Sequence, residues 1–216
     1  MNKTASHKKS IREISDEIIQ LFQEKGQYQY GGESVNQLEH ALQSAAHAQK
    51  MKLSEELVIA ALLHDLGHLL DHDFESSSEF ENDSENHTDG QVRENNDLSE
   101  DHQHEILGDR YLQNYFGPEL TEPVRLHVAA KRFLCTKDES YYQKLSHASI
   151  LSLKLQGGKM SDGEMETFLK NPYAQSALQI RACDDEAKVI GKLIPPLEAY
   201  RPLLEKVIAK YRTSRN

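Results

Sequence analysis

The sequence lacks any apolar run that could cross a membrane. Its longest apolar stretches, such as residues 58–63, fall far short of the roughly 20 residues that a membrane-spanning helix needs. Residues 1–11 are polar and rich in lysine, with no apolar run behind them, so they do not resemble a secretory signal. We therefore expect a cytoplasmic protein with no membrane partner.

Cysteine is also scarce, with only Cys135 and Cys183 in the chain. A lone pair of cysteines in a chain without a signal peptide is more often reduced than joined in a disulfide. We therefore assign neither residue a role.

Strand-like alternation of apolar and polar residues is missing as well, and the chain has no internal repeat. Apolar residues recur instead at helical spacing, which predicts helices at residues 10–25, 34–51, 54–70, 104–116, 122–134, 140–154, 161–171, 172–188 and 196–211. With 216 residues and 38% hydrophobic content, the chain can bury one good core but is short for two. The sequence therefore predicts an all-α protein whose single domain spans residues 1–216.

The net charge of −10 is concentrated in one segment of the chain. Residues 71–101 hold twelve acidic residues and one arginine, a net charge of −11, so the remainder of the chain carries +1. This segment has few apolar residues to offset the entropy of ordering it, and we interpret residues 72–102 as an exposed insertion. We expect no nucleic-acid partner, and the acidic segment gives no information about the substrate.

Histidines and aspartates at positions that otherwise form apolar helical faces are the strongest chemical signal. His64 and Asp65 end an apolar helix, and a bare pair of this kind is common in proteins without a metal. Four further residues of the same types lie in predicted helices, namely His40, His104, His127 and Asp184. Buried polar groups without partners cost a few kcal/mol each, and a shared metal satisfies all six. Four imidazoles and two carboxylates, one of them bridging, supply ligands for two metals, and this mixture favours iron or manganese over calcium.

The order of these residues resembles the HD superfamily. Its pattern of a histidine, a His-Asp pair and a distant aspartate is matched by His40, His64, Asp65 and Asp184. The resemblance implies an HD-type helical bundle. The two additional histidines, His104 and His127, resemble the dinuclear branch of the superfamily. Two chemistries remain open at this point, which are hydrolysis of phosphate esters and oxygen-dependent chemistry at two irons.

Four further motifs are similar to the organophosphonate-cleaving HD oxygenases, the PhnZ-type enzymes, which share a fold with myo-inositol oxygenase. They are Tyr-Gly-Gly-Glu at 30–33, His-Val-Ala-Ala-Lys-Arg at 127–132, Ser-Ile-Leu-Ser-Leu-Lys-Leu-Gln-Gly-Gly at 149–158 and Arg-Ala-Cys-Asp-Asp at 181–185. The resemblance implies a catalytic core of about residues 28–190. It also implies a mixed-valent Fe(II)/Fe(III) pair, O2 as co-substrate, and oxidative cleavage of the carbon–phosphorus bond of a small 1-hydroxyphosphonate.

Several residues are predicted to bind the phosphonate. Lys131 lies one helical turn after His127, and Arg181 nearly one turn before Asp184, so both cationic groups can share the face that carries the metals. His68, one turn after His64, adds a further donor, and Ser149 adds a hydroxyl. A solvated charge or an ordinary ion pair is the alternative for the two cations.

For Tyr30 and Glu33 the resemblance implies a gate. The tyrosine would occupy an iron position in the resting enzyme and move away together with the glutamate when substrate arrives. Glu33 would then accept hydrogen bonds from a substrate ammonium, which favours 2-amino-1-hydroxyethylphosphonate, cleaved to glycine and phosphate. The trimethylammonium analogue is the nearest competitor, because Tyr28 and Tyr30 could begin an aromatic cage.

Two other functions remain compatible with the ligand set alone. One is an HD-domain phosphohydrolase acting on a nucleotide or another phosphate monoester, and the other is a noncatalytic HD sensor. His102 also competes with His104 as a metal ligand, since the two flank Gln103, and His104 is preferred because Glu105 and Gly108 accompany it. The sequence leaves the oligomeric state open.

Overall fold

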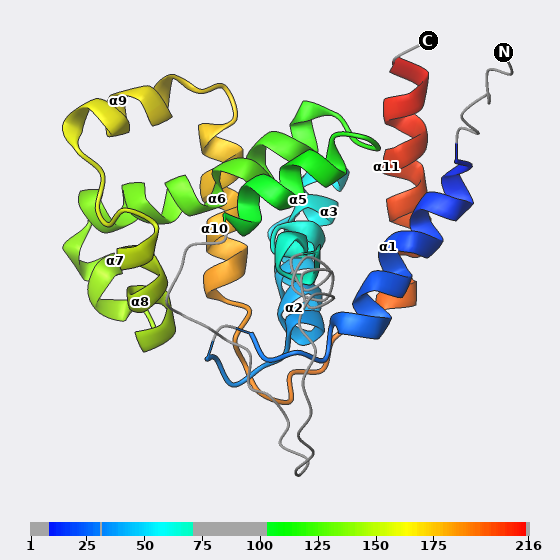
Figure 1. Cartoon of the computed structure of the whole chain (residues 1–216), viewed down its shortest axis with the longest axis horizontal. Coiled ribbons are helices and arrows are strands. Elements are labelled where there is room, and N and C mark those ends of the chain that lie inside the picture. Colours follow the sequence, from blue (N-terminus) through cyan, green and yellow to red (C-terminus); the bar gives the residue numbers. More distant parts are fainter. Residues whose placement is uncertain (1–8, 31, 71–102, 215–216) are drawn as a thin grey trace, which may run out of the picture.

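The computed structural model describes residues 9–30, 32–70 and 103–214, so the acidic segment at 72–102 and the competing ligand His102 lie outside the described residues. Helices account for the regular structure of the described part, apart from one isolated bridge between Gln29 and Asn36. They are α1 (Ile11–Lys25), α2 (Gln37–Lys50), α3 (Glu55–Leu63), α5 (His104–Leu112), α6 (Pro118–Lys137), α7 (Glu139–Lys144), α8 (His147–Leu155), α9 (Asp162–Lys170), α10 (Ala174–Asp185), the 3-10 helix η1 (Leu197–Tyr200) and α11 (Arg201–Ser214) (Figure 1). The prediction of an all-α, single-domain protein is confirmed.

Many helix starts follow from side chains that cap them. Ser10, Asn36 and Ser161 each accept a hydrogen bond from the backbone N–H three residues later, and a glutamate at that later position bonds back. This reciprocal capping box satisfies two backbone donors that a helix start otherwise leaves unpaired. The beginnings of α1, α2 and α9 are therefore fixed locally by the sequence.

Two predicted helices are each interrupted in the structure. The apolar pattern at 54–70 predicted one helix, but α3 ends at Leu63 and the chain turns at His64 and Asp65 before helical structure resumes. The pattern at 140–154 likewise divides into α7 and α8, because Leu145 is extended and Ser146 caps the start of α8. Periodicity misses both breaks, since the apolar residues on either side keep the same spacing. Both breaks lie at the candidate site described below.

The helices pack around a central pair, α2 and α3, with α10 and α6 against them. On one side α1 and α11 lie side by side, and on the other side α7, α8 and α9 extend outward from α6 (Figure 1). The larger apolar core joins α1, α2, α3 and α11, and includes the fully buried Phe22, Phe116 and Tyr200. A smaller cluster around Phe133 and Phe168 fixes α9 against α6. These two cores hold α2, α3, α5, α6 and α10 in place, and all six predicted metal ligands come from these helices or from the turn that follows α3.

In the ranges that the structure covers, none of the helices combines the length and the apolar content that a membrane span requires.

Candidate functional site

The turn after α3 brings two adjacent side chains to one centre. Neighbouring residues on a regular helix point about 100° apart. At His64 and Asp65 the helix is interrupted, and the His64 Nε2 atom lies 3.2 Å from an Asp65 carboxylate oxygen. The Nδ1 atom of His64 is 2.9 Å from the Ala61 carbonyl oxygen, which orients the ring toward the centre of the molecule. The interruption that periodicity failed to predict therefore allows both groups to face the same point.

His40 and His64 form the first histidine pair of the site. Their Nε2 atoms lie 3.2 Å apart, and the Nδ1 atom of His40 is 3.0 Å from the Ala187 carbonyl oxygen. A carbonyl only accepts hydrogen bonds, so Nδ1 of each ring carries hydrogen and Nε2 of a neutral ring presents a lone pair. Two lone pairs facing each other repel unless a proton or a metal ion lies between them. Imidazole nitrogens that share a metal at about 2.1 Å and roughly a right angle lie about 3 Å apart.

His104 and His127 form a second pair of the same kind. Their Nε2 atoms lie 3.1 Å apart, and the Nδ1 atom of His127 is 2.7 Å from the Val124 carbonyl oxygen. His104 begins α5, and its backbone approaches Gly67 so closely that a Cβ atom at Gly67 would lie 1.9 Å from the His104 carbonyl oxygen. Only glycine allows this approach. The position of the second pair therefore depends on Gly67.

Asp65 lies between the two histidine pairs. Its Oδ2 atom is 3.5 Å from His40 Nε2 and 3.2 Å from His64 Nε2. Its Oδ1 atom is 3.2 Å from His104 Nε2 and 3.4 Å from His127 Nε2. Oδ2 is buried and has no hydrogen-bond partner, although an unsatisfied buried carboxylate oxygen is costly. This is the arrangement expected of a carboxylate that bridges two metals.

Asp184, in α10, completes the first half of the site. Its Oδ1 atom lies 3.4 Å from His40 Nε2, and its Oδ2 atom accepts a hydrogen bond of 2.6 Å from Arg181. The structure thus brings all six predicted ligands together. His68 also reaches this region, because its ring stacks on His104 at a centroid distance of 4.0 Å. Ligand atoms of Asp65, His68 and His104 all lie within 4.8 Å of one another, so His68 is close enough to share a metal ion with these two residues.

The electrostatics of this cluster favour a cation. Burial holds the pKa of His40 at about 4 and that of His104 at about 3, so both rings are neutral near pH 7 and offer lone pairs. Burial also lowers the pKa of His64, but Asp65 and Asp184 outweigh it and raise this pKa to about 9. Without a metal, the two carboxylates therefore draw a proton onto His64. Bound metals would take the place of that proton, and the nitrogen and oxygen donors present fit them.

Tyr30 covers the first half of the cluster. Its ring stacks on His40 at a centroid distance of 3.8 Å and an interplanar angle of 13°, and its hydroxyl donates to Asp184 over 3.4 Å. Burial, followed by the charges of Asp184 and Asp65, raises the pKa of Tyr30 well above its usual value. The phenol therefore stays protonated beside these carboxylates. Glu33 points elsewhere, because it accepts a hydrogen bond from Ser146 and forms an ion pair with Lys188.

The residues predicted to bind an anion gather beside the metal ligands. Lys131 is 4% exposed and donates to Ser152 over 2.9 Å, while burial and the nearby Arg181 lower its pKa to about 8. Ser149 is buried in α8, and Arg181 is buried in α10. Lys131 and Arg181 are thus buried cations beside the predicted metal ligands, and an anionic group would compensate the charge of Lys131, since Arg181 is already paired with Asp184 and Asp185.

Arg181 already has several partners in the protein. It donates to Asp184, to Asp185 and, through Nε, to the Tyr141 hydroxyl over 2.9 Å. The same tyrosine donates to Asp185 over 2.7 Å. Three of the five N–H groups of the guanidinium are therefore used, which leaves two for a ligand. Arg181 therefore links Asp184, a predicted metal ligand, to the predicted anion-binding region.

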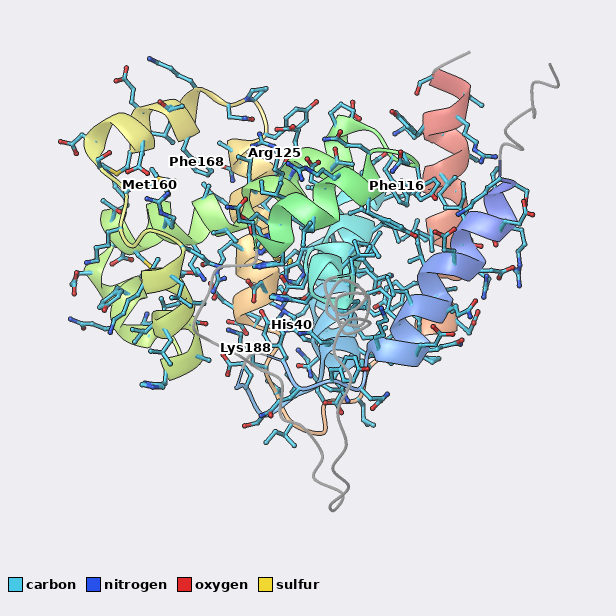
Figure 2. The ribbon with its side chains drawn as sticks, in the orientation of Figure 1. His40, Phe116, Arg125, Met160, Phe168 and Lys188 are labelled. Atoms are coloured by element: carbon cyan, nitrogen blue, oxygen red, sulfur yellow. The ribbon has the colours of Figure 1, made fainter. Side chains whose placement is uncertain are left out.

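Sequence reasoning missed Lys188, Tyr141 and Asp185. Lys188 follows the end of α10, and its ammonium lies 3.1 Å from Glu33 and donates to Ser149 over 2.9 Å. Lys188 and His40 lie in the same region of the molecule (Figure 2). Lys188 is four residues after Asp184, but α10 ends at Asp185, so helical spacing does not predict that Lys188 shares a face with Asp184.

Comparison with known proteins agrees with this geometry. The family model described as "HD domain" matches residues 38–153. A hydroxymethylphosphonate dioxygenase from Gimesia maris is 42% identical over 191 residues, which cover 88% of this chain and 86% of the relative. A [1-hydroxy-2-(trimethylamino)ethyl]phosphonate dioxygenase (glycine-betaine-forming) from Leisingera caerulea is 35% identical over 211 residues, 98% of each chain.

The matched range contains five of the six predicted metal ligands, and the sixth, Asp184, lies within the length shared with the second relative. The HD-domain model matches more than half of the chain, and the two relatives are at least 35% identical over most of it. Together these matches establish common descent. The chain belongs to the HD-domain family and, within it, to the organophosphonate-cleaving oxygenases.

Proposed function

We propose that the protein is a diiron oxygenase that uses O2 to cleave the carbon–phosphorus bond of a small 1-hydroxyphosphonate. The observation that carries this proposal is Asp65, whose two carboxylate oxygens face two separate histidine pairs. One metal would be held by His40, His64, Asp65 and Asp184. The other would be held by Asp65, His104 and His127, with His68 beside them.

The chemistry of a C–P bond supports a redox reaction. Attack by a metal-bound hydroxide suffices for phosphate esters, but a phosphonate has no comparable leaving group. Two iron ions in a mixed-valent Fe(II)/Fe(III) state would supply O2 activation and redox equivalents. In the balanced reaction the 1-hydroxyphosphonate and O2 give a carboxylic acid and inorganic phosphate. The C–P bond, one C–H bond at C1 and the O–O bond break, the carbon and the phosphorus each end with one more oxygen, and the hydrogen from C1 ends on oxygen.

The residues of the chain would bind and orient the substrate. Lys131 and the two remaining N–H groups of Arg181 would donate to the phosphonate oxygens, and Ser149 would add a hydroxyl. Their burial excludes water, so these charged contacts are stronger than they would be on the surface. Tyr30 would act as a gate, because its ring and hydroxyl cover His40 and Asp184 and must move for a ligand to reach them.

For the group on C2 of the substrate, we propose an amino group and hence 2-amino-1-hydroxyethylphosphonate, cleaved to glycine and phosphate. Glu33 supports this choice, since a carboxylate accepts hydrogen bonds that a primary ammonium offers and a trimethylated nitrogen cannot. The names of the two relatives make hydroxymethylphosphonate and the trimethylammonium compound the competing substrates. Tyr28, which is 48% exposed, could contribute an aromatic face to the latter.

A substrate panel tests the proposal directly. The protein is loaded with iron anaerobically and then exposed to air with each of the three 1-hydroxyphosphonates, while phosphate release and oxygen consumption are recorded together. We expect one phosphate per O2 for at least one compound, with the amino compound turned over fastest. Phosphate release from phosphate monoesters without oxygen uptake would instead identify an HD phosphohydrolase and overturn the proposal.

A further inference from the structure

Lys188 lies close to three residues that have been assigned to the substrate or to the gate. Its Nζ atom lies 3.1 Å from a Glu33 carboxylate oxygen and donates to the Ser149 hydroxyl over 2.9 Å. The same ammonium lies 5.8 Å from the centre of the Tyr30 ring. Its side chain is 16% exposed and that of Glu33 is 13% exposed, so the ion pair is largely shielded from water.

Lys188 also belongs electrostatically to the anion-binding region. Its charge is one of those that lower the pKa of Lys131, after burial and the charge of Arg181. Three cations therefore act on one small region. Arg181 is matched there by Asp184 and Asp185, and Lys188 by Glu33. Within the residues that the structure describes, no carboxylate forms an ion pair with Lys131.

We propose that Lys188 is a further phosphonate-binding residue, which Glu33 holds until the phosphonate of the substrate replaces the carboxylate. This inference rests on the proposed function. A dianionic phosphonate placed at Ser149 would lie within reach of the Lys188 ammonium and would compete with Glu33 for it. Once displaced, Glu33 is a largely shielded carboxylate that has lost its cation, and this loss costs free energy unless another cation takes that place.

This exchange couples recognition of the anion to the choice of substrate. A substrate with an ammonium group on C2 supplies the replacement cation for Glu33. Hydroxymethylphosphonate supplies none, so its binding must leave Glu33 uncompensated. Replacing Glu33 by glutamine therefore has opposite effects on the two compounds. It should strengthen binding of hydroxymethylphosphonate, since no ion pair has to be broken, and weaken binding of the amino compound.

The test is titration calorimetry of the iron-loaded protein without oxygen, so that binding is measured without turnover. Lys188→Met keeps most of the apolar side chain and removes the charge, while Lys188→Arg keeps the charge. Lys192→Met is the matched control, because Lys192 is exposed in the same segment. For hydroxymethylphosphonate we expect Lys188→Met to raise Kd by about ten- to a hundredfold, the usual effect of losing one charge-assisted contact. Lys188→Arg should recover most of this loss, and Lys192→Met should equal the unmodified protein.

Two outcomes would overturn the exchange. One is an unchanged Kd for hydroxymethylphosphonate in Lys188→Met. The other is an equal loss of affinity for both substrates in Glu33→Gln, which would make Glu33 a structural partner of Lys188 and nothing more. Inorganic phosphate serves as a second probe. If the unmodified protein releases no phosphate from any 1-hydroxyphosphonate, the proposed function fails, whereas weaker phosphate binding by Lys188→Met alone would still support an anion-binding Lys188.

Discussion

The two halves of the candidate site have opposite electrostatic needs. The metal half presents buried lone pairs and carboxylate oxygens, among them an Asp65 oxygen with no hydrogen-bond partner. The anion half presents buried cations and hydroxyls, with Lys131 hydrogen-bonded to a serine and in no ion pair within the described residues. The first half is stabilised by cations and the second by an anion. The proposed substrate, which joins a hydroxyl that can chelate a metal to a phosphonate, would therefore satisfy both halves at once.

The largest expected effect is on the metal half, and it comes from Asp65→Asn. The substitution keeps the size of the side chain but removes the charge that faces both histidine pairs, so both metals should be lost. Metal content after gel filtration, measured by mass spectrometry, checks this. Asp109→Asn is a matched control, because Asp109 is buried in α5 but is not one of the six ligands. His40→Ala should chiefly lower the affinity for one metal, the one assigned to His40, His64, Asp65 and Asp184. Full retention of a single metal by Asp65→Asn would show that the carboxylate does not bridge.

A smaller but still large effect is expected from Gly67→Ala. The new Cβ atom would lie 1.9 Å from the His104 carbonyl oxygen, so the start of α5 must move and carry His104 away from Asp65. Affinity for the metal bound by His104 and His127 should fall more than affinity for the metal bound by His40 and His64. Gly163→Ala in α9 is the control, because a Cβ atom there meets nothing within 4 Å. Equal retention of both metals in the two variants would contradict the dependence of the second histidine pair on Gly67.

Much of this arrangement could be predicted from the sequence, for identifiable reasons. The helices are amphipathic and capped, so their periodicity and their N-terminal serines and asparagines place them within a few residues. The six predicted ligands stood out because imidazoles and carboxylates on apolar faces need partners. Periodicity predicted the all-α class, the family resemblance added the HD-type helical bundle, and the structure confirms the class.

The missed features are those that depend on tertiary contacts. The turn at His64 and Asp65 is hidden inside an apolar pattern, and the partner of Glu33 comes from a residue 155 positions further along the chain. Lys188 lies beyond the end of α10, where helical spacing no longer fixes direction. Ser146 gave a usable signal, because a serine before a run of apolar residues predicts an N-cap, and this would have revealed the break between α7 and α8.

The next prediction distinguishes Lys131 from Arg181, which the sequence analysis assigned to the same role of binding the phosphonate. Lys131→Met should weaken phosphonate binding by about ten- to a hundredfold and leave the metals in place, because Lys131 donates to Ser152 and not to a predicted metal ligand. Arg181→Met should weaken phosphonate binding. It should also lower metal affinity by about ten- to a hundredfold, because Arg181 orients Asp184. Metal titration and anaerobic substrate titration of both variants check this. Equal metal affinity in the two variants would mean that Asp184 does not need its arginine.

The smallest expected effect is a dependence on pH that belongs to the anion half alone. Burial and the charge of Arg181 lower the pKa of Lys131 to about 8, so this lysine is charged below that pH and neutral above it. Attraction for a phosphonate dianion should therefore fall as the pH rises through about 8, and kcat/KM should fall with it. Lys131→Arg should lack this decline, since an arginine stays charged up to a pH of about 12. Ionisation of the substrate and of the metal half affects both proteins alike, so the ratio of their kcat/KM values between about pH 6.5 and 9.5 isolates residue 131. A ratio that stays constant across this range would assign any decline to another group and leave Lys131 as a cation that does not titrate.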